Sequence, residues 1–223
     1  MESQTNKKKT SNPKRFLFIT LDSLIADIAW RISNEGHKVK YYVENAEDKD
    51  VGRGFIEMVD SWQDHVDWAD IIVFDDVLGQ GKKATMLRKK GKLVIGGTEY
   101  TDKLEDDRDF GQEELTKLGI STIPHRSFTK FKDAIRHVEQ DPGKYVIKPC
   151  GESANLKGLL YIGEEDDGRD VIQVLSDYEK AWSSKIPLFQ LQNRIKGVEI
   201  AVGAFFNGKE FIYPININFE HKK

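Results

Sequence analysis

The sequence predicts an α/β protein, with a doubly wound parallel sheet in its first part and a smaller α+β region after it. Up to about residue 98, short apolar runs typical of buried strands alternate with stretches of helical periodicity. Beyond that point the order changes, and two strand-like runs flank a loop with a lysine on each side, at residues 145–163 (YVIKPCGESANLKGLLYIG). We therefore expect two regions of different architecture.

The first predicted strand is residues 15–20 (RFLFIT). The side-chain oxygen of Asp22 or Ser23 is expected to cap the helix that follows, because it can accept the first unpaired N–H groups. Apolar residues recur at helical spacing across residues 24–32, and Gly36 supplies a C-terminal stop.

The alternation then continues along the first region. Further strands are predicted at residues 39–43, 71–77 and 93–95, and a lysine-rich helix is predicted at residues 82–90. A polar, irregular stretch separates the second strand from the third. Residues 79–84 (GQGKKA) touch the dinucleotide-binding fingerprint but lack the rest of it, so they are interpreted as a plain strand-to-helix turn.

The second region mixes helices with strand pairs. Helices are predicted at residues 104–118, 131–138 and 171–182, with an extended segment at residues 120–128. Near the end of the chain, Asn207 and Gly208 lie between two strand-like runs. This dipeptide tolerates positive φ at both positions, which predicts a hairpin with a type I′ turn.

The loop between the two lysines is the first motif that suggests chemistry. Lys148 ends one strand-like run, and Lys157 precedes Gly158 where the next begins. A loop closed over a polyanion by a lysine and backbone N–H groups can hold nucleotide phosphates. A second location, residues 189–199 (FQLQNRIKGVE), offers a short strand, a glycine and a carboxylate. Together they favour a two-lobed clamp for ATP, although either lysine could instead be a solvated charge.

The composition excludes several classes of protein. Among 223 residues, 34 basic side chains against 37 acidic ones argue against general nucleic-acid binding. No apolar run approaches the length of a membrane span, and the lysine-containing N-terminus lacks the apolar stretch of a secretory signal. Cys150 is the single cysteine, so no intramolecular disulfide forms, and we expect a cytoplasmic protein with this thiol buried. The oligomeric state stays open.

Six segments occur in an order that resembles the ATP-grasp ligases, most closely phosphoribosylamine–glycine ligase (glycinamide ribonucleotide synthetase) of purine synthesis. They are residues 104–110 (LEDDRDF), 120–128 (ISTIPHRSF), 145–151 (YVIKPCG), 157–158 (KG), 192–199 (QNRIKGVE) and 218–223 (NFEHKK). The resemblance spans residues 15–223.

The resemblance implies a division of the chain. Residues 1–13 would be a disordered tail, and residues 14–98 a Rossmann-like pre-ATP-grasp domain. Residues 99–187 would form a linking helix and the small ATP-grasp lobe, and residues 188–223 the first strands of a truncated large lobe. In the family, Mg²⁺ ligands lie beyond the point that matches Lys223, so the resemblance implies ATP and Mg²⁺ but places no metal ligand in this chain.

The resemblance also implies a set of nucleotide-contacting residues. They are Arg108, Lys148, Lys157, Gln192, Asn193, Arg194, Ile195, Glu199 and Lys223. The lysines at 148 and 157 would contact phosphates, and residues 192–195 would meet the adenine edge through their backbone. Glu199 would accept hydrogen bonds from the ribose, Arg108 would replace a nucleotide-contacting lysine, and Lys223 would replace a closing arginine. Arg108 could equally form surface ion pairs with its acidic neighbours.

The implied activity is ATP-dependent ligation of a carboxylate to an amine through an acyl phosphate, with glycine and phosphoribosylamine as substrates. Two departures keep other functions open. Residues 20–23 (TLDS) stand where the family has a glycine-rich loop, and Gln192 and Asn193 replace two carboxylates. A different ATP-grasp ligase, or a non-catalytic nucleotide-binding or scaffolding module, therefore remains possible.

Overall fold

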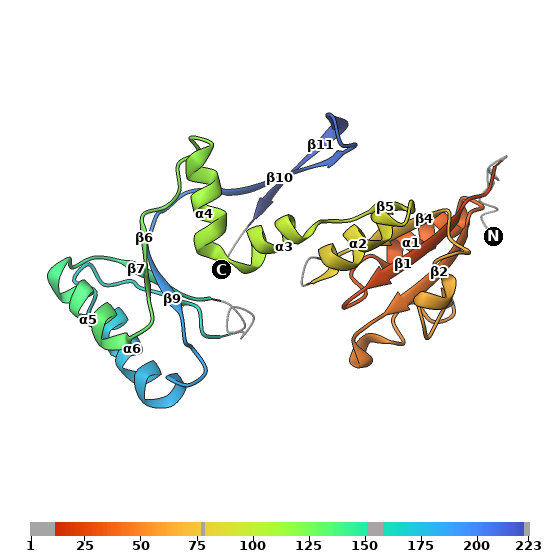
Figure 1. Cartoon of the computed structure of the whole chain (residues 1–223). Coiled ribbons are helices and arrows are strands. Elements are labelled where there is room, and N and C mark those ends of the chain that lie inside the picture. Colours follow the sequence, from red (N-terminus) through yellow and green to blue (C-terminus); the bar gives the residue numbers. More distant parts are fainter. Residues whose placement is uncertain (1–11, 77–78, 151–157, 221–223) are drawn as a thin grey trace, which may run out of the picture. The chain divides into compact units, whose positions relative to one another are not determined.

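The computed structural model describes residues 12–76, 79–150 and 158–220. The chain forms two compact units, one ending at Ile120 and the other beginning at Ser121 (Figure 1). The expected boundary before residue 99 thus precedes the observed division, because the intervening helices pack with the first unit. No helix in the described ranges is long and apolar enough to cross a membrane.

The first unit contains a five-stranded sheet in the order β3-β2-β1-β4-β5, and every neighbouring pair is parallel. Its strands are β1 (Arg15–Thr20), β2 (Lys38–Val43), β3 (Glu57–Met58), β4 (Ile71–Phe74) and β5 (Leu93–Ile95). The predicted doubly wound sheet is confirmed. The two-residue strand β3 lies in the stretch that the sequence indicated as irregular, because so short a strand shows no periodicity.

Both faces of this sheet are buried, as a doubly wound fold requires. On one face Phe18 and Tyr41 pack with Ala29 of helix α1 (Ala26–Asn34). On the other, Leu17 and Ile72 pack with Leu87 of α2 (Gln80–Lys89). Successive residues of β1 therefore enter different cores, which explains why the run at residues 15–20 is almost wholly apolar.

The start of α1 differs from the prediction. The residue before the helix is Ile25, and no side chain caps it. Ser23 instead has φ of 60°, and its hydroxyl donates to Tyr41 Oη at 3.1 Å. The predicted cap is wrong because the Ser23 hydroxyl bonds to the buried Tyr41 hydroxyl and not to the first N–H groups of the helix. Trp30 of the same helix is 47% exposed.

A single helix was expected across residues 104–118, but the chain forms α3 (Glu99–Asp106) and α4 (Arg108–Lys117). The break is at Asp107, which has extended backbone angles and accepts a hydrogen bond from the Phe110 N–H at 3.0 Å. A carboxylate that caps a new helix ends the old one, because Asp107 cannot be in both. The periodicity was compatible with both arrangements.

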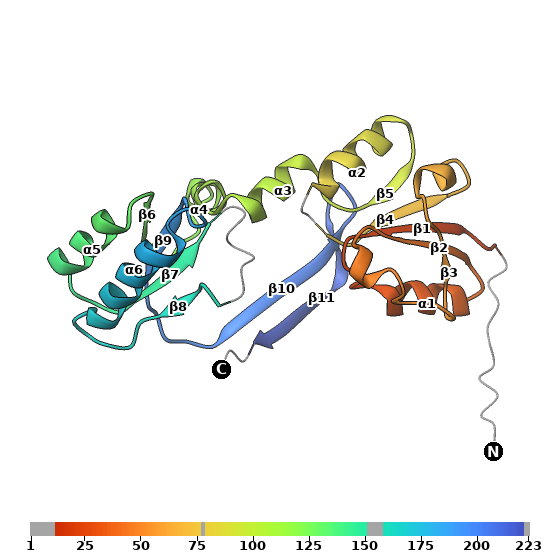
Figure 2. The same cartoon turned by 90° about the horizontal axis from the view of Figure 1, so that it is seen from below.

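The second unit contains a four-stranded antiparallel sheet in the order β6-β9-β7-β8. The strands are β6 (His125–Phe128), β7 (Tyr145–Pro149), β8 (Tyr161–Ile162) and β9 (Phe189–Asn193). Helices α5 (Phe131–Gln140) and α6 (Arg169–Trp182) pack side by side against one face of this sheet (Figure 2). Both helices were predicted.

Leu175 of α6 lies at the centre of this core and is fully buried. Replacing Leu175 by Ala is expected to lower the free energy of unfolding of the second unit by about 2–5 kcal/mol, because the lost methyl groups leave a cavity. Chemical denaturation followed by circular dichroism measures the change. Leu160, 52% exposed, is the matched control. An equal loss in Leu160→Ala would contradict the assignment of the core.

The last two strands, β10 (Glu199–Phe206) and β11 (Phe211–Glu220), form a separate antiparallel hairpin. The predicted hairpin is confirmed, but the type I′ turn is wrong, since Gly208 has positive φ and Asn207 does not. Asn207 Oδ1 accepts hydrogen bonds from the N–H groups of Lys209 and Glu210, at 2.9 and 3.0 Å. This side-chain capping stabilises a four-residue loop in place of the two-residue turn.

Candidate functional site

Strands β7 and β9 present different chemistry on their two faces. Tyr145 and Ile147 enter the core beneath α5 and α6, as do Phe189 and Leu191. Alternation along a strand then directs Lys148 to the opposite face. Lys148 pairs with Gln190 across the sheet, so these two side chains lie on the same face.

Strand β6 extends this arrangement. Ser127 pairs with Gln190 and His125 pairs with Gln192. Gln190 and Gln192 are 0% and 5% exposed, and Gln192 Nε2 donates to Gln190 Oε1 at 3.4 Å. We call His125, Ser127, Lys148, Gln190 and Gln192 the polar sheet face. Buried amides and a lysine opposite an apolar core are suited to bind a polar, anionic ligand.

Sequence reasoning found two members of this face, Lys148 and Gln192, and missed the other three. The signal for Gln190 was present, because residues 190–192 (QLQ) alternate with a period of two about a core leucine. His125 and Ser127 could not be found this way. Their place depends on the pairing of β6 with β9, which are more than sixty residues apart in the chain.

The four residues predicted to meet adenine lie at the end of β9. The N–H groups of Asn193 and Arg194 donate to the carbonyls of Pro124 and Lys144, both at 2.9 Å, so the sheet already uses them. The Arg194 guanidinium binds the Gly163 carbonyl at 2.9 Å and the Glu164 carboxylate at 2.5 Å. Arg194 therefore ties β9 to the end of β8. Ile195 follows the strand and is 64% exposed, and its contact with adenine stays a prediction.

The remaining predicted residues are more scattered. Glu199 is the exposed first residue of β10. Arg108 belongs to the first unit, where it begins α4 and lines an open pocket of about 300 Å³ with Leu104 and Leu115. Its Nε is buried without a hydrogen-bond partner among the described residues. Lys157 and Lys223 lie outside the described residues. The contact of Lys157 with phosphate therefore stays a prediction.

In a dinucleotide-binding fingerprint, the N-terminus of the helix binds phosphate. At the N-terminus of α2, a carboxylate of the protein itself takes that place. The Gly81 N–H donates to both carboxylate oxygens of Asp102, at 2.9 and 3.2 Å. A Cβ on Gly81 would lie 2.2 Å from the carbonyl oxygen of Thr98, so a glycine is needed for this close helix packing. The glycines at 79 and 81 thus make a plain strand-to-helix turn, as interpreted.

Asp75 directly follows β4 and is a carboxylate whose pKa is strongly raised. Both its oxygens are shielded from solvent and have no hydrogen-bond partner in the described part of the chain. Burial raises its pKa from 3.8 to about 6, and the neighbouring charge of Asp76 adds to the effect. The nearby N–H groups of Leu21 and Leu24 only partly offset it. The sequence offered no signal for this residue.

The pKa of Asp75 predicts a pH-dependent stability. Because the folded pKa of about 6 exceeds 3.8 in the unfolded chain, the folded state holds the proton more tightly. The contribution of Asp75 to stability is therefore greatest below 3.8 and is lost as pH rises towards 6. Replacing Asp75 by Asn is expected to raise the melting temperature at pH 7, by an increment that shrinks on acidification. An increment that is the same at all pH values would contradict this interpretation.

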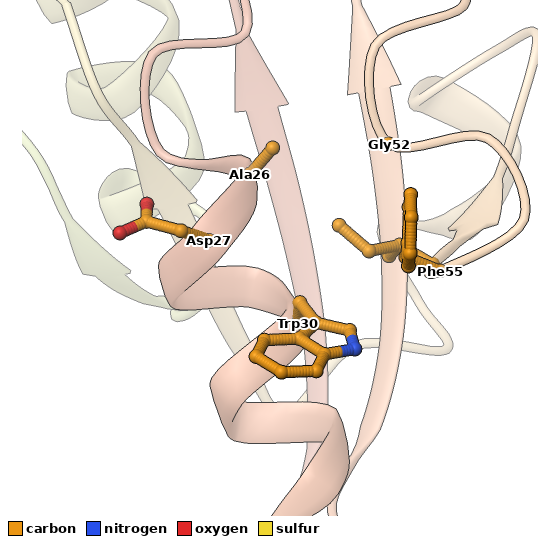
Figure 3. Close-up of a pocket in the computed structure, with 6 residues that line it drawn as sticks. Ala26, Asp27, Trp30, Gly52 and Phe55 are labelled. Atoms are coloured by element: carbon orange, nitrogen blue, oxygen red, sulfur yellow. The ribbon is translucent and has the colours of Figure 1, made fainter.

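A separate pocket lies beside α1, with a volume of about 290 Å³. It is lined by Ala26, Asp27, Trp30, Gly52, Phe55 and Ile56. Figure 3 shows Trp30 on α1 and Phe55 on the facing loop at opposite sides of the pocket, while the carboxylate of Asp27 points away from both. The pocket is almost wholly apolar and contains none of the predicted site residues.

Part of this chain is similar in sequence to known proteins. No family model matches the chain. Phosphoribosylamine–glycine ligase of Listeria monocytogenes is 26% identical over 137 residues, which are 61% of this chain and 32% of that protein. The human trifunctional purine biosynthetic protein adenosine-3 is 25% identical over 138 residues, 13% of its length. The matched part is therefore about a third or less of these curated relatives.

Solved structures extend the likeness to nearly the whole chain. N5-carboxyaminoimidazole synthetase of Staphylococcus aureus, complexed with ADP, gives a TM-score of 0.67 at 15% identity, covering 97% of this chain and 57% of that one. Phosphoribosylamine–glycine ligase of Thermotoga maritima gives 0.62 at 17%, covering 90% and 48%. A RimK domain ATP-grasp protein of Sphaerobacter thermophilus gives 0.57 at 14%, covering 88% and 70%. The chain thus has the fold of part of an ATP-grasp ligase, and over part of its length its sequence is similar to phosphoribosylamine–glycine ligase.

Proposed function

We propose that the chain is part of an ATP-dependent carboxylate–amine ligase of purine biosynthesis, of the phosphoribosylamine–glycine ligase type. The observation that carries the proposal is the polar sheet face, which sets Lys148 beside the buried Gln190 and Gln192 in a fold shared with a solved ADP complex. In this proposal the polar sheet face is the nucleotide site.

Each group has a role that its chemistry supports. The Lys148 ammonium stabilises the negative charge of the phosphates through charge-assisted hydrogen bonds. The amides of Gln190 and Gln192 orient the bound nucleotide, since each carries both donors and an acceptor. Glu199 accepts from ribose hydroxyls, and the backbone after β9 meets the adenine edge. The sheet register supports the roles of Lys148, Gln190 and Gln192, whereas the roles of Glu199 and of the backbone after β9 rest on the resemblance alone.

The proposed reaction proceeds in two steps. An oxygen of the carboxylate substrate attacks the γ-phosphorus of ATP, forming an acyl phosphate as the bond to ADP breaks. The amine then attacks the acyl carbon, phosphate leaves, and the nitrogen loses a proton. The protein contributes positioning and charge stabilisation. Among the described residues no group of three or more acidic, histidine or cysteine side chains fits a metal ion, so no step is assigned to Mg²⁺.

A first test uses the chain of residues 1–223. We expect ATP binding with a dissociation constant no better than high micromolar, and no ligase product from glycine, phosphoribosylamine, ATP and Mg²⁺. The reason is that the chain spans about half of the solved ligase structures and offers no described metal cluster. Calorimetric titration measures binding, and chromatographic detection of glycinamide ribonucleotide measures catalysis. Absence of any ATP binding would contradict the proposed nucleotide site, and product above background would contradict the second expectation.

A non-catalytic nucleotide-binding module is the second candidate. It is favoured by Gln192 and Asn193, which stand where the family has two carboxylates. Neutral amides keep the hydrogen bonds but remove the charge. Assays of the full-length product of the gene distinguish the two functions. ATP hydrolysis that depends on a carboxylate and an amine supports a ligase, whereas binding without hydrolysis supports the module.

A further inference from the structure

The solvent side of helix α1 carries large apolar side chains. Ala29 lies in the core of the first unit, and Ile25 and Ile32 pack against that core. The same helix exposes Ile28 and Trp30, which are 48% and 47% exposed. A helix that packs one side on a sheet usually presents charged and polar residues to solvent. Large apolar side chains gathered on the solvent side are typical of a binding surface.

The pocket of about 290 Å³ beside α1 joins this helix to the segment before β3. Trp30 and Phe55 lie at its opposite sides (Figure 3), and Phe55 is 71% exposed. Gly52 has φ of 96°, a conformation that side chains rarely adopt, and its missing side chain leaves the pocket open. Val51, the residue before it, is 41% exposed. We call this surface the outer face of α1, and it consists of Asp27, Ile28, Trp30, Arg31, Val51 and Phe55.

The size of the outer face of α1 matches what a stable protein contact needs. Leu24, 67% exposed, continues the face in front of the helix. With it, the exposed apolar side chains of the face offer roughly 300–500 Å². A standard interface buries about 800 Å² on each partner, and somewhat more than half of that area is apolar. A small molecule inside the pocket would leave Ile28 and Leu24 in water, whereas a protein surface covers them.

The charges of this face complement a second copy of the same face. Asp27 and Arg31 are both exposed and lie one helical turn apart. Arg31 Nε binds Glu35 Oε1 at 3.0 Å, but both side chains are more than half exposed, and such a pair contributes little. In a twofold contact, residue i of one copy meets residue j of the other, and j meets i. When two α1 helices lie antiparallel about an axis opposite Ala29, Asp27 meets the partner's Arg31 and Ile28 meets the partner's Trp30.

We propose that the outer face of α1 is a dimer interface, occupied by a second copy of this chain in an antiparallel twofold contact. Trp30 and Phe55 form its apolar centre, where the pocket of each copy is covered by the other. The pairs of Asp27 with the partner's Arg31 form its charged rim. Every residue involved belongs to the first unit, so the inference is independent of the proposed nucleotide site in the second unit.

Sedimentation velocity of the chain of residues 1–223, from low micromolar concentration upwards, tests the proposal. We expect a reversible equilibrium between monomer and dimer. Phe55→Ser should weaken dimerisation about tenfold or more, because an aromatic residue at the centre of an interface carries much of the binding energy. Phe205→Ser is the matched control, since Phe205 of β10 is 72% exposed against 71% for Phe55. This control should dimerise as the parent does.

A charge exchange tests the antiparallel pairing at exposed positions, where a substitution leaves the core intact. Asp27→Arg and Arg31→Asp should each weaken dimerisation severalfold, because like charges then meet across the twofold axis. The double variant should recover most of the parent's affinity. The proposal is overturned if the parent stays monomeric up to millimolar concentration, or if Phe55→Ser dimerises as tightly as the parent. A double variant no tighter than either single variant overturns the antiparallel contact.

Discussion

Replacing Lys148 by Ala is expected to weaken ATP binding by about tenfold or more. A charge-assisted contact to phosphate contributes roughly 1.5–3 kcal/mol, against about 1 kcal/mol for a neutral hydrogen bond. Lys148 is the described cation that shares a sheet face with Gln190, so its loss should outweigh that of any single amide. Gln192→Ala is accordingly expected to cost less than Lys148→Ala.

Calorimetric titration with ATP and with a non-hydrolysable analogue measures this effect. Lys144 offers a matched control, because it precedes the same strand and its ammonium is paired with Asp166 at 3.1 Å. Lys144→Ala removes the same charge and is expected to leave the affinity nearly unchanged. If Lys148→Ala binds ATP as tightly as the parent, the phosphates are bound elsewhere and the polar sheet face is not the nucleotide site.

Replacing Gly81 by Ala is expected to destabilise the first unit, although the same exchange inside a helix usually stabilises by about 1 kcal/mol. The new Cβ would lie 2.2 Å from the Thr98 carbonyl oxygen and 2.5 Å from Asp102 Oδ1. Helix α2 must then move away from α3, which breaks the hydrogen bonds from the Gly81 N–H to Asp102. Overpacking of this kind costs about 1–3 kcal/mol, and the lost hydrogen bond to a charged group adds to it.

Thermal and chemical unfolding of the chain measure this effect. Gly197 is the matched control, because its φ is ordinary and a Cβ there would meet no atom within 4 Å. Gly197→Ala should therefore leave the stability almost unchanged. A Gly81→Ala variant as stable as the parent would show that α2 and α3 separate easily, and that the Asp102 carboxylate does not hold the N-terminus of α2.

The sequence by itself determined most of the elements of both units and the class of the fold. The run at residues 15–20 predicted a strand buried on both faces, because each of its faces enters a core. The helices at α5 and α6 and the strand around Lys148 followed from the same local periodicity. Such patterns are readable because burial repeats every two residues along a strand and every three to four along a helix.

Only the tertiary structure decided which side chains of those elements lie next to one another. The pairing of β6 with β9 brought His125 and Ser127 to Gln192 and Gln190, and the parallel pairing of β1 with β4 placed Asp75 beside Thr20. The tertiary structure also drew Ser23 from a cap to Tyr41, which is eighteen residues away in the chain. The physical reason is that register and the loss of water around a polar group depend on residues far apart in the chain. Local periodicity carries no record of those distant neighbours.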